Sequence, residues 1–360
     1  MCMNFKKYTV KENVRFFGRT AEVEGEKGVF FNASGSGFTF TFIGTAAKAY
    51  FYAGASHDTV CDDEHRGYIS VFVDDMPISV SRFQLDRMSD WYTLAENLPF
   101  GEHTVRVIKG TEVGFGRASV TEIMCEGDLV APQKEKPLKL EFIGDSITCG
   151  YGNICSNGSS EFTTREEDFS QTYAAFTAKL LDAELSCIAA SGNGFYHDYG
   201  CNTHNLIPEL YAYTDKMLDE HCGKTARKWD FQNDKRDAVI IKLGQNDGQF
   251  CSGADLPEAE RKPDILAERR SKFQEVAYSF LSDITIYRPD TPIVLIVEDD
   301  MLLKNELINA AEKIDSVHLL KIQSKRPYEA VGANGHWSVH THSRVALQLS
   351  QFLKELLCLQ

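Results

Sequence analysis

The pattern of apolar residues changes about a third of the way along the chain, at the segment APQKEKP (131–137). Before it, short runs of β-branched and aromatic residues alternate with polar ones, as in FTFTFIG at 38–44. After it, continuous apolar runs alternate with segments of helical periodicity. A period of two is typical of half-buried strands, whereas apolar strands that alternate with helices are typical of a parallel sheet. We therefore expect a multidomain chain with two architectures.

Residues 1–130 are predicted to form an all-β domain, with roughly eight or nine strands at a spacing typical of sandwiches. Phe38, Phe40 and Phe42 alternate with threonines, which predicts a strand with one buried and one exposed face. Glycine- and serine-rich turns separate the runs. The pattern favours a jelly-roll β-sandwich. The polar segment 131–137, which holds two prolines, is the expected linker.

Residues 138–360 are predicted to form an α/β domain, in which helices cover both faces of a parallel sheet (α/β/α). The periodicity predicts strands at about 138–144, 185–190, 238–244, 292–297 and 317–322, and helices at about 168–182, 263–287, 301–314 and 342–357. Asp168 or Ser170 is the expected cap of the first of these helices, and Pro289 ends the second.

Composition limits the partners and the compartment. The formal net charge of -14 argues against binding to nucleic acid or to an anionic membrane. No run of about 18 apolar residues predicts a transmembrane helix, and the N-terminus lacks the apolar core of about 7–15 residues found in signal peptides. We therefore expect a cytoplasmic protein. The ten cysteines contain no C-x-x-C pair, so reduced thiols are expected rather than disulfides or structural zinc.

Four short polar motifs follow predicted strands or precede the last predicted helix. They are Gly144-Asp145-Ser146, Ser191-Gly192-Asn193-Gly194, Gly244-Gln245-Asn246-Asp247 and Asn334-Gly335-His336. Sites in α/β folds lie at the carboxyl ends of strands, where loops of this kind meet. Each motif alone is also ordinary capping or turn chemistry.

The residue types suit acyl transfer by a serine nucleophile. Ser146 at a strand-to-helix turn exposes its hydroxyl, and a histidine such as His336 can act as its general base. Asn246 offers an amide donor, and the glycines of the second motif leave backbone N–H groups accessible. Three histidines within residues 336–342 also suggest zinc, but no carboxylate or thiolate stands at a ligand's spacing, so no metal is expected.

Taken in this order, the four motifs resemble those of the SGNH hydrolases, the serine esterases also called GDSL type. Their name stands for the serine, glycine, asparagine and histidine that are here Ser146, Gly192, Asn246 and His336. The segments NVRFFGRT, SGSGFTFTFIGT and GDSITCGYG further resemble carbohydrate esterase family 2. That family joins an N-terminal jelly roll to an SGNH domain and removes acetyl groups from plant glycans.

The resemblance implies a mechanism without a metal or an organic cofactor. Ser146 would attack the acetyl carbonyl with His336 as base, and the backbone N–H groups of Ser146 and Gly192 and the amide of Asn246 would bind the oxyanion. Gly194 is an alternative to Gly192, because the SGNG run permits either alignment.

The chain departs from the family where an aspartate usually precedes the histidine, since Ala333 and Asn334 occupy those positions. The family includes Ser–His dyads, so catalysis is still expected. Either the amide oxygen of Asn334 or a backbone carbonyl such as that of Trp337 would orient the imidazole.

Aromatic residues in or beside the motif loops could stack on sugar rings or pack under the loops. They are Phe195, Tyr196, Tyr199 and Trp337. The acidic run Glu298-Asp299-Asp300 at a strand end is expected to begin the next helix rather than to line the pocket.

These observations predict a carbohydrate O-acetyl esterase that acts on plant-derived oligosaccharides of the mannan or xylan type. The alternatives are an SGNH esterase or thioesterase for lipid or acyl substrates, and a carbohydrate-binding protein without catalysis. A free histidine base predicts activity that falls below about pH 6.5.

Overall fold

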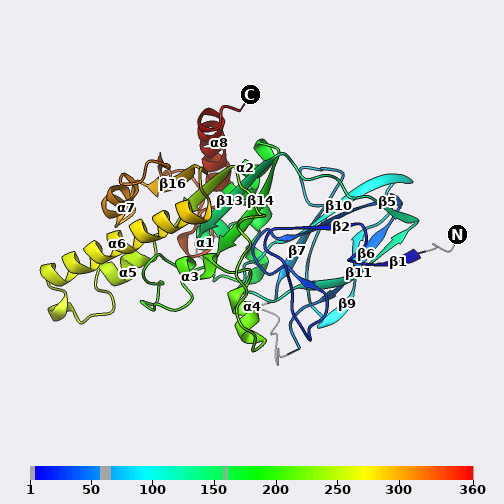
Figure 1. Cartoon of the computed structure of the whole chain (residues 1–360), viewed down its shortest axis with the longest axis horizontal. Helices are drawn as coiled ribbons and strands as arrows, with labels where there is room; N and C mark the ends of the chain where they lie inside the picture. The colour runs from blue at the N-terminus through cyan, green and yellow to red at the C-terminus, as the bar shows by residue number, and fades with distance from the viewer. Residues whose placement is uncertain (1–4, 57–65, 157, 159–160, 360) are drawn as a thin grey trace.

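The computed structural model describes residues 5–56, 66–156, 158 and 161–359. Its all-β part and its α/β part lie side by side (Figure 1). The last strand of the first part, β12 (Asp128–Val130), and the first strand of the second, β13 (Leu138–Gly144), flank the predicted linker. The two architectures expected from the sequence are therefore present, in the expected order.

Two antiparallel sheets form the all-β part. One has the strand order β3-β4-β11-β6-β9, with β1 paired to β11, and the other has the order β12-β5-β10-β7-β8, with β2 paired to β5. Apolar side chains from both sheets meet in one core. This is a β-sandwich, and its jelly-roll connectivity stays a prediction. Its remaining strands are β1 (Phe5–Thr9), β2 (Val14–Phe17), β3 (Ala21–Glu22), β4 (Val29–Phe30), β5 (Gly37–Gly44), β6 (Ala47–Tyr52), β7 (Tyr68–Val73), β8 (Ser81–Gln84), β9 (Ser89–Ala95), β10 (Gly101–Lys109) and β11 (Ser119–Glu126).

Strand β5 is buried on both faces, whereas the sequence predicted one exposed face. Its phenylalanines point into the sandwich core, but Thr39 and Thr41 on the other face are also buried. The hydroxyl of Thr39 donates to the carbonyl of Val105 at 2.9 Å. The prediction was wrong because this outer face lies against the α/β part, where Arg106 of β10 meets Glu184.

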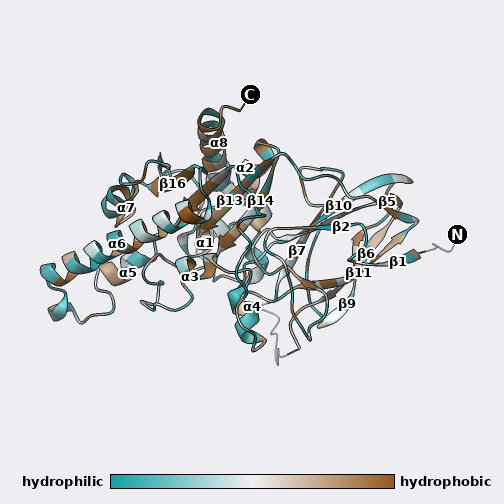
Figure 2. Cartoon of the chain, viewed as in Figure 1, coloured by the Kyte–Doolittle hydropathy of each residue, from teal (hydrophilic) through white to brown (hydrophobic). Residues whose placement is uncertain are grey.

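Five parallel strands form the second sheet, in the order β14-β13-β15-β16-β17. Successive side chains along a strand face opposite ways. Phe142 packs in the cluster with helices α2 (Tyr173–Leu180) and α8 (Val339–Leu356). Ile143 packs in the cluster with α3 (Ile207–Tyr211), α6 (Pro263–Tyr287) and α7 (Lys304–Ala311). Figure 2 shows the apolar strands between these helices. The predicted parallel sheet with helices on both faces is confirmed. The strands not yet bounded are β14 (Ala183–Ala189), β15 (Ala238–Lys242), β16 (Ile293–Glu298) and β17 (Val317–Ile322).

The long helix α6 (Pro263–Tyr287) matches its prediction, but the first predicted helix is found as two separate elements. Thr172 caps α2 (Tyr173–Leu180), whereas Asp168 caps a separate 3-10 turn. The other helices are α1 (Ser146–Cys149), α3 (Ile207–Tyr211), α4 (Lys216–His221), α5 (Asp247–Cys251), α7 (Lys304–Ala311) and α8 (Val339–Leu356), and the 3-10 helices are η1 (Thr164–Glu166), η2 (Phe169–Gln171), η3 (Glu258–Glu260) and η4 (Ala333–Gly335).

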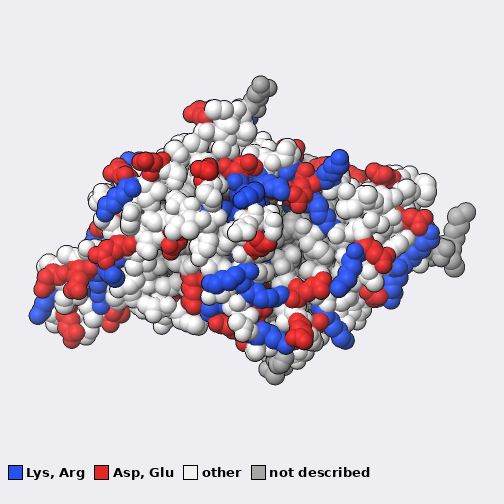
Figure 3. All heavy atoms as spheres, viewed as in Figure 1, with Lys and Arg blue, Asp and Glu red and all other residues white. Residues whose placement is uncertain are grey.

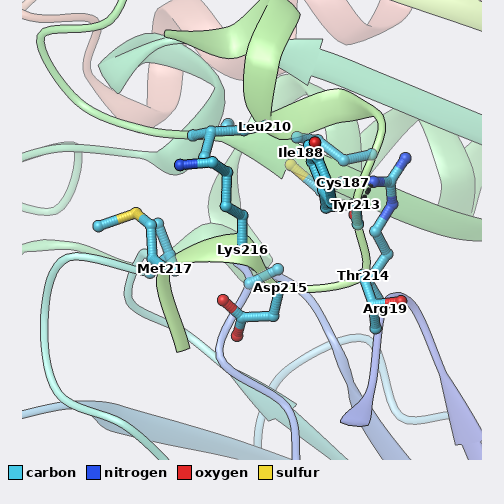
Figure 4. Close-up of a pocket in the computed structure, with 12 residues that line it drawn as sticks. Arg19, Cys187, Ile188, Leu210, Tyr213, Thr214, Asp215, Lys216 and Met217 are labelled. Carbon is cyan, nitrogen blue, oxygen red and sulfur yellow. Dashed lines mark hydrogen bonds between the residues drawn. The ribbon is translucent and has the colours of Figure 1, made fainter. Parts of the chain in front are cut away.

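Arg19 of the sandwich reaches into the α/β part. Its Nη1 donates to the carbonyls of Tyr211, at 2.6 Å, and Tyr213, and its Nη2 lies 3.5 Å from the buried carboxylate of Glu141 in β13. Figure 4 shows Arg19 beside a small cavity that Tyr213 and Cys187 also line. Because this guanidinium is buried, the contact fixes the sandwich firmly against the sheet.

A second buried contact lies at the amino end of β14. The carboxylate of Glu184 accepts from Arg15 at 2.8 Å and lies 3.4 Å from Arg106, and both arginines belong to the sandwich. The two guanidinium groups hold the pKa of Glu184 below its usual range although its burial opposes this. The interface between the two parts therefore contains charges that are paired only when both parts are present.

Charged side chains of both signs are interspersed on the face shown in Figure 3, where no large basic area is seen. Among the described residues, no helix combines the length and the apolar character that crossing a bilayer requires.

Candidate active site

Ser146 lies where β13 passes into the one-turn helix α1. The carboxylate of Asp145 caps this helix by accepting from the Ile147 N–H at 3.0 Å. The turn is tight, because a Cβ on Gly144 would stand 2.0 Å from Oγ1 of Thr148. The strand-to-helix turn predicted from the sequence is therefore present, with Ser146 at its first helical residue.

His336 meets Ser146 across 190 positions of the sequence. Its Nε2 lies 2.9 Å from Oγ of Ser146, and its Nδ1 lies 3.1 Å from the carbonyl oxygen of Ala333. A carbonyl can only accept, so Nδ1 carries the proton and Nε2 presents a lone pair to the hydroxyl. This is the arrangement in which a histidine takes a proton from a serine.

The prediction that the side chain of Asn334 orients the imidazole is wrong. Its amide Nδ2 instead donates to the Tyr151 hydroxyl at 3.2 Å, and its backbone is left-handed with φ 50°. The η4 turn brings the carbonyl of Ala333 back to both the backbone N–H and Nδ1 of His336. The group that lies at Nδ1 in this structure is the backbone carbonyl of Ala333, and not that of Trp337.

The imidazole of His336 is held in its neutral form. Burial lowers its pKa to about 4, and the charges of Lys242 and Lys325 add to this, while the carbonyl of Ala333 opposes it. At neutral pH the base is therefore unprotonated and ready to accept.

The loop after β14 holds the candidate oxyanion glycine. Gly192 has φ +75°, and the nearest atom to a Cβ built on it is 3.8 Å away, on Tyr199. A Cβ on Gly194 would instead lie 2.1 Å from the carbonyl of His197, against the Asp247 carboxylate. The tight packing of Gly194 favours Gly192 as the residue beside the site.

Asn246 and Asp247 hold this loop from the neighbouring strand end. The amide Nδ2 of Asn246 donates to the carbonyl of Asn193 at 2.7 Å, and a second hydrogen on the same nitrogen remains for a substrate. The carboxylate of Asp247 accepts three consecutive backbone N–H groups, those of residues 195–197, at 2.7–3.0 Å. Burial raises the pKa of Asp247 to about 6 despite these bonds. Sequence reasoning treated Asp247 as turn chemistry and missed this role.

A buried ion cluster beneath the dyad was also missed. The ammonium of Lys242 lies 2.9 Å from Glu298 and 3.6 Å from Asp145, and all three side chains are buried. Burial raises the pKa of Asp145, while Lys242 opposes the shift. The lysine at the end of the apolar run AVIIK was the available signal, because such a charge is buried only with partners.

Trp337 does not face a substrate, so its predicted stacking role is wrong. Its side chain is 1% exposed, and its indole Nε1 donates to Glu298 at 3.1 Å. The prediction that Glu298-Asp299-Asp300 begins a helix is wrong as well, because α7 starts only at Lys304. Glu298 instead joins the ion cluster, and Asp300 accepts from the Ser324 hydroxyl at 2.7 Å.

The other aromatic residues singled out from the sequence differ in how far they are exposed. Phe195 is 1% exposed and packs on Phe273 and Phe280, so it cannot stack on a sugar. Tyr196 is half-buried against Phe250. Tyr199 is 63% exposed, and its backbone N–H donates to the carbonyl of Gly192 at 2.7 Å.

An aromatic pair that the sequence did not single out lies beside the base. The ring of Tyr151 is stacked on Phe162 with centroids 3.7 Å apart, and lies 4.5 Å from the imidazole of His336. The half-buried Tyr151 therefore packs directly beside the base.

The three histidines of the last motif point to different partners. His340 lies at 4.0 Å from Glu329, and Nδ1 of the buried His342 accepts from the Tyr173 N–H at 3.1 Å. In the described part of the chain, no three His, Cys, Asp or Glu side chains are grouped as a metal ion would require. The described cysteines form no disulfide.

Comparison with known proteins shows which families and folds this chain is similar to. Residues 16–133 match the model of the carbohydrate esterase 2 N-terminal domain. The chain is 27% identical over 333 residues to the cellulase/esterase CelE of Acetivibrio thermocellus, covering 89% of this chain and 37% of CelE. It is also 27% identical over 216 residues to an acetylxylan esterase / glucomannan deacetylase of Cellvibrio japonicus, covering 56% of this chain and 58% of the relative. The chain thus spans little more than half, or less, of these relatives.

A solved family 2 carbohydrate esterase from Clostridium thermocellum, in complex with cellohexaose, superposes with a TM-score of 0.81 and 24% identity. The match covers 96% of this chain and 100% of the other. The chain therefore carries the N-terminal domain of carbohydrate esterase family 2 and has the fold of that family, as its motifs predicted.

Proposed function

We propose that the chain is a carbohydrate O-acetyl esterase that works through an acetyl-enzyme on Ser146. The observation that carries this proposal is the 2.9 Å contact between Nε2 of His336 and Oγ of Ser146, with Nδ1 held by the carbonyl of Ala333. The neutral imidazole, the accessible Gly192 and the amide of Asn246 supply the remaining requirements of acyl transfer.

In the proposed reaction, Oγ of Ser146 bonds to the acetyl carbon while its proton passes to Nε2 of His336. The N–H groups of Ser146 and Gly192 and the Asn246 amide donate hydrogen bonds that stabilise the negative charge on the carbonyl oxygen. The ester bond to the sugar then breaks, and His336 returns the proton to the leaving hydroxyl. Water, activated by the same imidazole, releases acetate and restores the serine. The proposal uses no metal or organic cofactor.

The substrate class is proposed from the relatives and from exposed aromatic surface. The named relatives include an acetylxylan esterase / glucomannan deacetylase, and a family 2 structure holds cellohexaose. The exposed ring of Tyr199, whose backbone N–H donates to the carbonyl of Gly192, suits stacking on a sugar. We therefore propose that the substrates are acetylated oligosaccharides of the mannan or xylan type. We also propose that the protein acts in the cytoplasm and that its N-terminal sandwich is a jelly roll.

Acetate release tests this proposal directly. We expect acetate from acetylated manno- or xylo-oligosaccharides, and faster cleavage of 4-nitrophenyl acetate than of the octanoate. Preference for octanoate would favour the lipid or acyl esterase, and activity on simple esters without release from sugars would refute the glycan assignment. A chain that cleaves no ester but binds cellohexaose would be a binding protein.

The rate should stay high in acid, because the pKa of the half-buried His336 is lowered to about 4. We expect kcat/KM for 4-nitrophenyl acetate to fall as the pH drops through about 4, and not below about 6.5 as a solvated histidine would predict. A midpoint between pH 6 and 7 would contradict the lowered pKa of the imidazole.

Acid unfolding must be separated from this titration. In the unfolded chain, His336 and His342 are protonated below about pH 6.5. In the folded chain, burial lowers the pKa of His342 to about 3. The unfolded state then binds more protons, so stability falls as the pH drops below about 6.5. Enzyme held at each pH and assayed again at pH 7 shows whether the lost rate is recovered.

Asn334→Ala should change kcat by less than about threefold, because its amide contacts the Tyr151 hydroxyl and not the imidazole. Steady-state kinetics on 4-nitrophenyl acetate measure the change in kcat. Asn193→Ala, which changes an asparagine in the loop after β14, is the matched comparison. A loss of about 100-fold in Asn334→Ala alone would restore the side chain as the orienting group.

A further inference from the structure

One side chain of the β-sandwich touches the loop that carries Gly192. The Oε2 atom of Glu112 accepts from the backbone N–H of Ser191 at 2.6 Å, and the Sγ of Cys149 in α1 lies 3.7 Å from the same oxygen. Glu112 is 3% exposed and belongs to the loop between β10 and β11. A residue of the other domain is therefore bonded both to the nucleophile's helix and to the residue before Gly192.

The loop that delivers Glu112 is built around a buried cation. The ammonium of Lys109, at the end of β10, donates to the backbone carbonyls of Thr111, Glu112 and Phe115 at 2.7–3.1 Å. Burial lowers the pKa of Lys109 to about 8, which leaves it charged at neutral pH. A charged donor with several carbonyl acceptors fixes the shape of a short loop.

The α/β part holds the same loop from the other side. The backbone N–H of Glu112 donates to Oε1 of the buried Glu167 at 2.7 Å, and the N–H of Phe169 donates to the carbonyl of Gly110 at 2.8 Å. The loop that carries Glu112 is thus held by both domains, and the carboxylate of Glu112 accepts from the backbone N–H of Ser191.

We propose that Glu112 is a positioning residue that sets the oxyanion N–H of Gly192 from the sandwich domain. The inference rests on the proposed function, because it assigns a role to the oxyanion site used there. The glycine loop would be held at its start by Glu112 and at its end by Asp247, which accepts the N–H groups of Phe195, Tyr196 and His197. Small displacements of such donors reduce the rate without weakening the binding of the substrate.

The test compares Glu112→Ala and Glu112→Gln with Glu184→Gln in the full chain. Glutamine at 112 keeps an oxygen that accepts from Ser191, whereas alanine removes it. Glu184 is the matched control, because it is also buried between the domains but lies at the opposite end of β14. The readouts are kcat and KM for 4-nitrophenyl acetate and the rate at which diethyl 4-nitrophenyl phosphate phosphorylates Ser146, releasing 4-nitrophenolate.

We expect Glu112→Ala to reduce kcat and the phosphorylation rate by about 10- to 100-fold with KM within about twofold. Glu112→Gln should recover most of the loss, and Glu184→Gln should keep kcat within about twofold. Equal rates in the wild type and Glu112→Ala, or no recovery with glutamine, would overturn the proposal.

Hydrogen exchange provides a readout that does not need activity. The peptide over 188–196 should exchange faster in Glu112→Ala and not in Glu184→Gln, and unchanged protection would refute the positioning role. A wild type that releases no acetate from oligosaccharides would refute only the glycan substrate, since neither the phosphorylation nor the exchange measurement involves a sugar.

Discussion

Replacing Ser146 with alanine should lower the rate of acetate release by about four to six orders of magnitude. The hydroxyl of Ser146 is the group within 2.9 Å of the neutral imidazole, and no acetyl-enzyme can form without it. Acetate release from 4-nitrophenyl acetate and from acetylated oligosaccharides measures the loss. The fold should be unaffected, because the substitution removes one oxygen.

Ser350→Ala is the matched control, since Ser350 is a buried serine on α8. It should retain full activity and should still be labelled by an organophosphonate, whereas Ser146→Ala should show no added mass. Labelling of the Ser146→Ala protein, or oligosaccharide cleavage within tenfold of the wild type, would require another nucleophile.

The largest expected effect on stability belongs to Lys242→Met. Removing the ammonium leaves Asp145 and Glu298 buried without the cation that lies between them. Breaking a buried ion pair in this way typically costs about 3–5 kcal/mol. Urea unfolding followed by fluorescence measures the change in the free energy of unfolding.

Lys216→Met provides the comparison, because Lys216 is also buried but its partners Glu209 and Glu220 are exposed. It should lose about 1 kcal/mol or less. Burial raises the pKa of Asp145, and the loss of Lys242 removes the main opposing charge. The folded variant then binds more protons than the unfolded chain, so the defect of Lys242→Met should shrink as the pH falls. A loss of about 1 kcal/mol or less in Lys242→Met as well would show that the cluster is not stabilising.

The sequence predicted the dyad because its members stand in motifs that turn geometry and strand ends constrain. Ser146 follows a buried strand, and His336 precedes the last amphipathic helix, so the parallel sheet must bring both to one edge. The group behind the imidazole could not be predicted in the same way. A backbone carbonyl carries no side-chain signature, and the left-handed turn at Asn334 that presents Ala333 is a local fold rather than a residue type.

Burial was the quantity that sequence patterns judged least well. Phe195 and Trp337 look like sugar-stacking residues because they adjoin the motifs, but the sheet and its helices leave no solvent at either position. Thr39 looks exposed because it alternates with phenylalanine, yet the α/β part covers it. Each of these errors depends on a contact between distant segments, which no local period records.

The paired charges between the sandwich and the sheet limit how the two parts of the chain can be recombined, both in the laboratory and in evolution. A chimera that joins residues 138–360 to a foreign sandwich would lose Arg15 and Arg106, and the carboxylate of Glu184 would then stand without a counter-charge. Glu112 would be lost from the serine loop in the same exchange. A crossover at 131–137 falls in a permissive surface segment and yet separates residues that function together. Such halves are therefore expected to be inherited, and shuffled in the laboratory, as one unit.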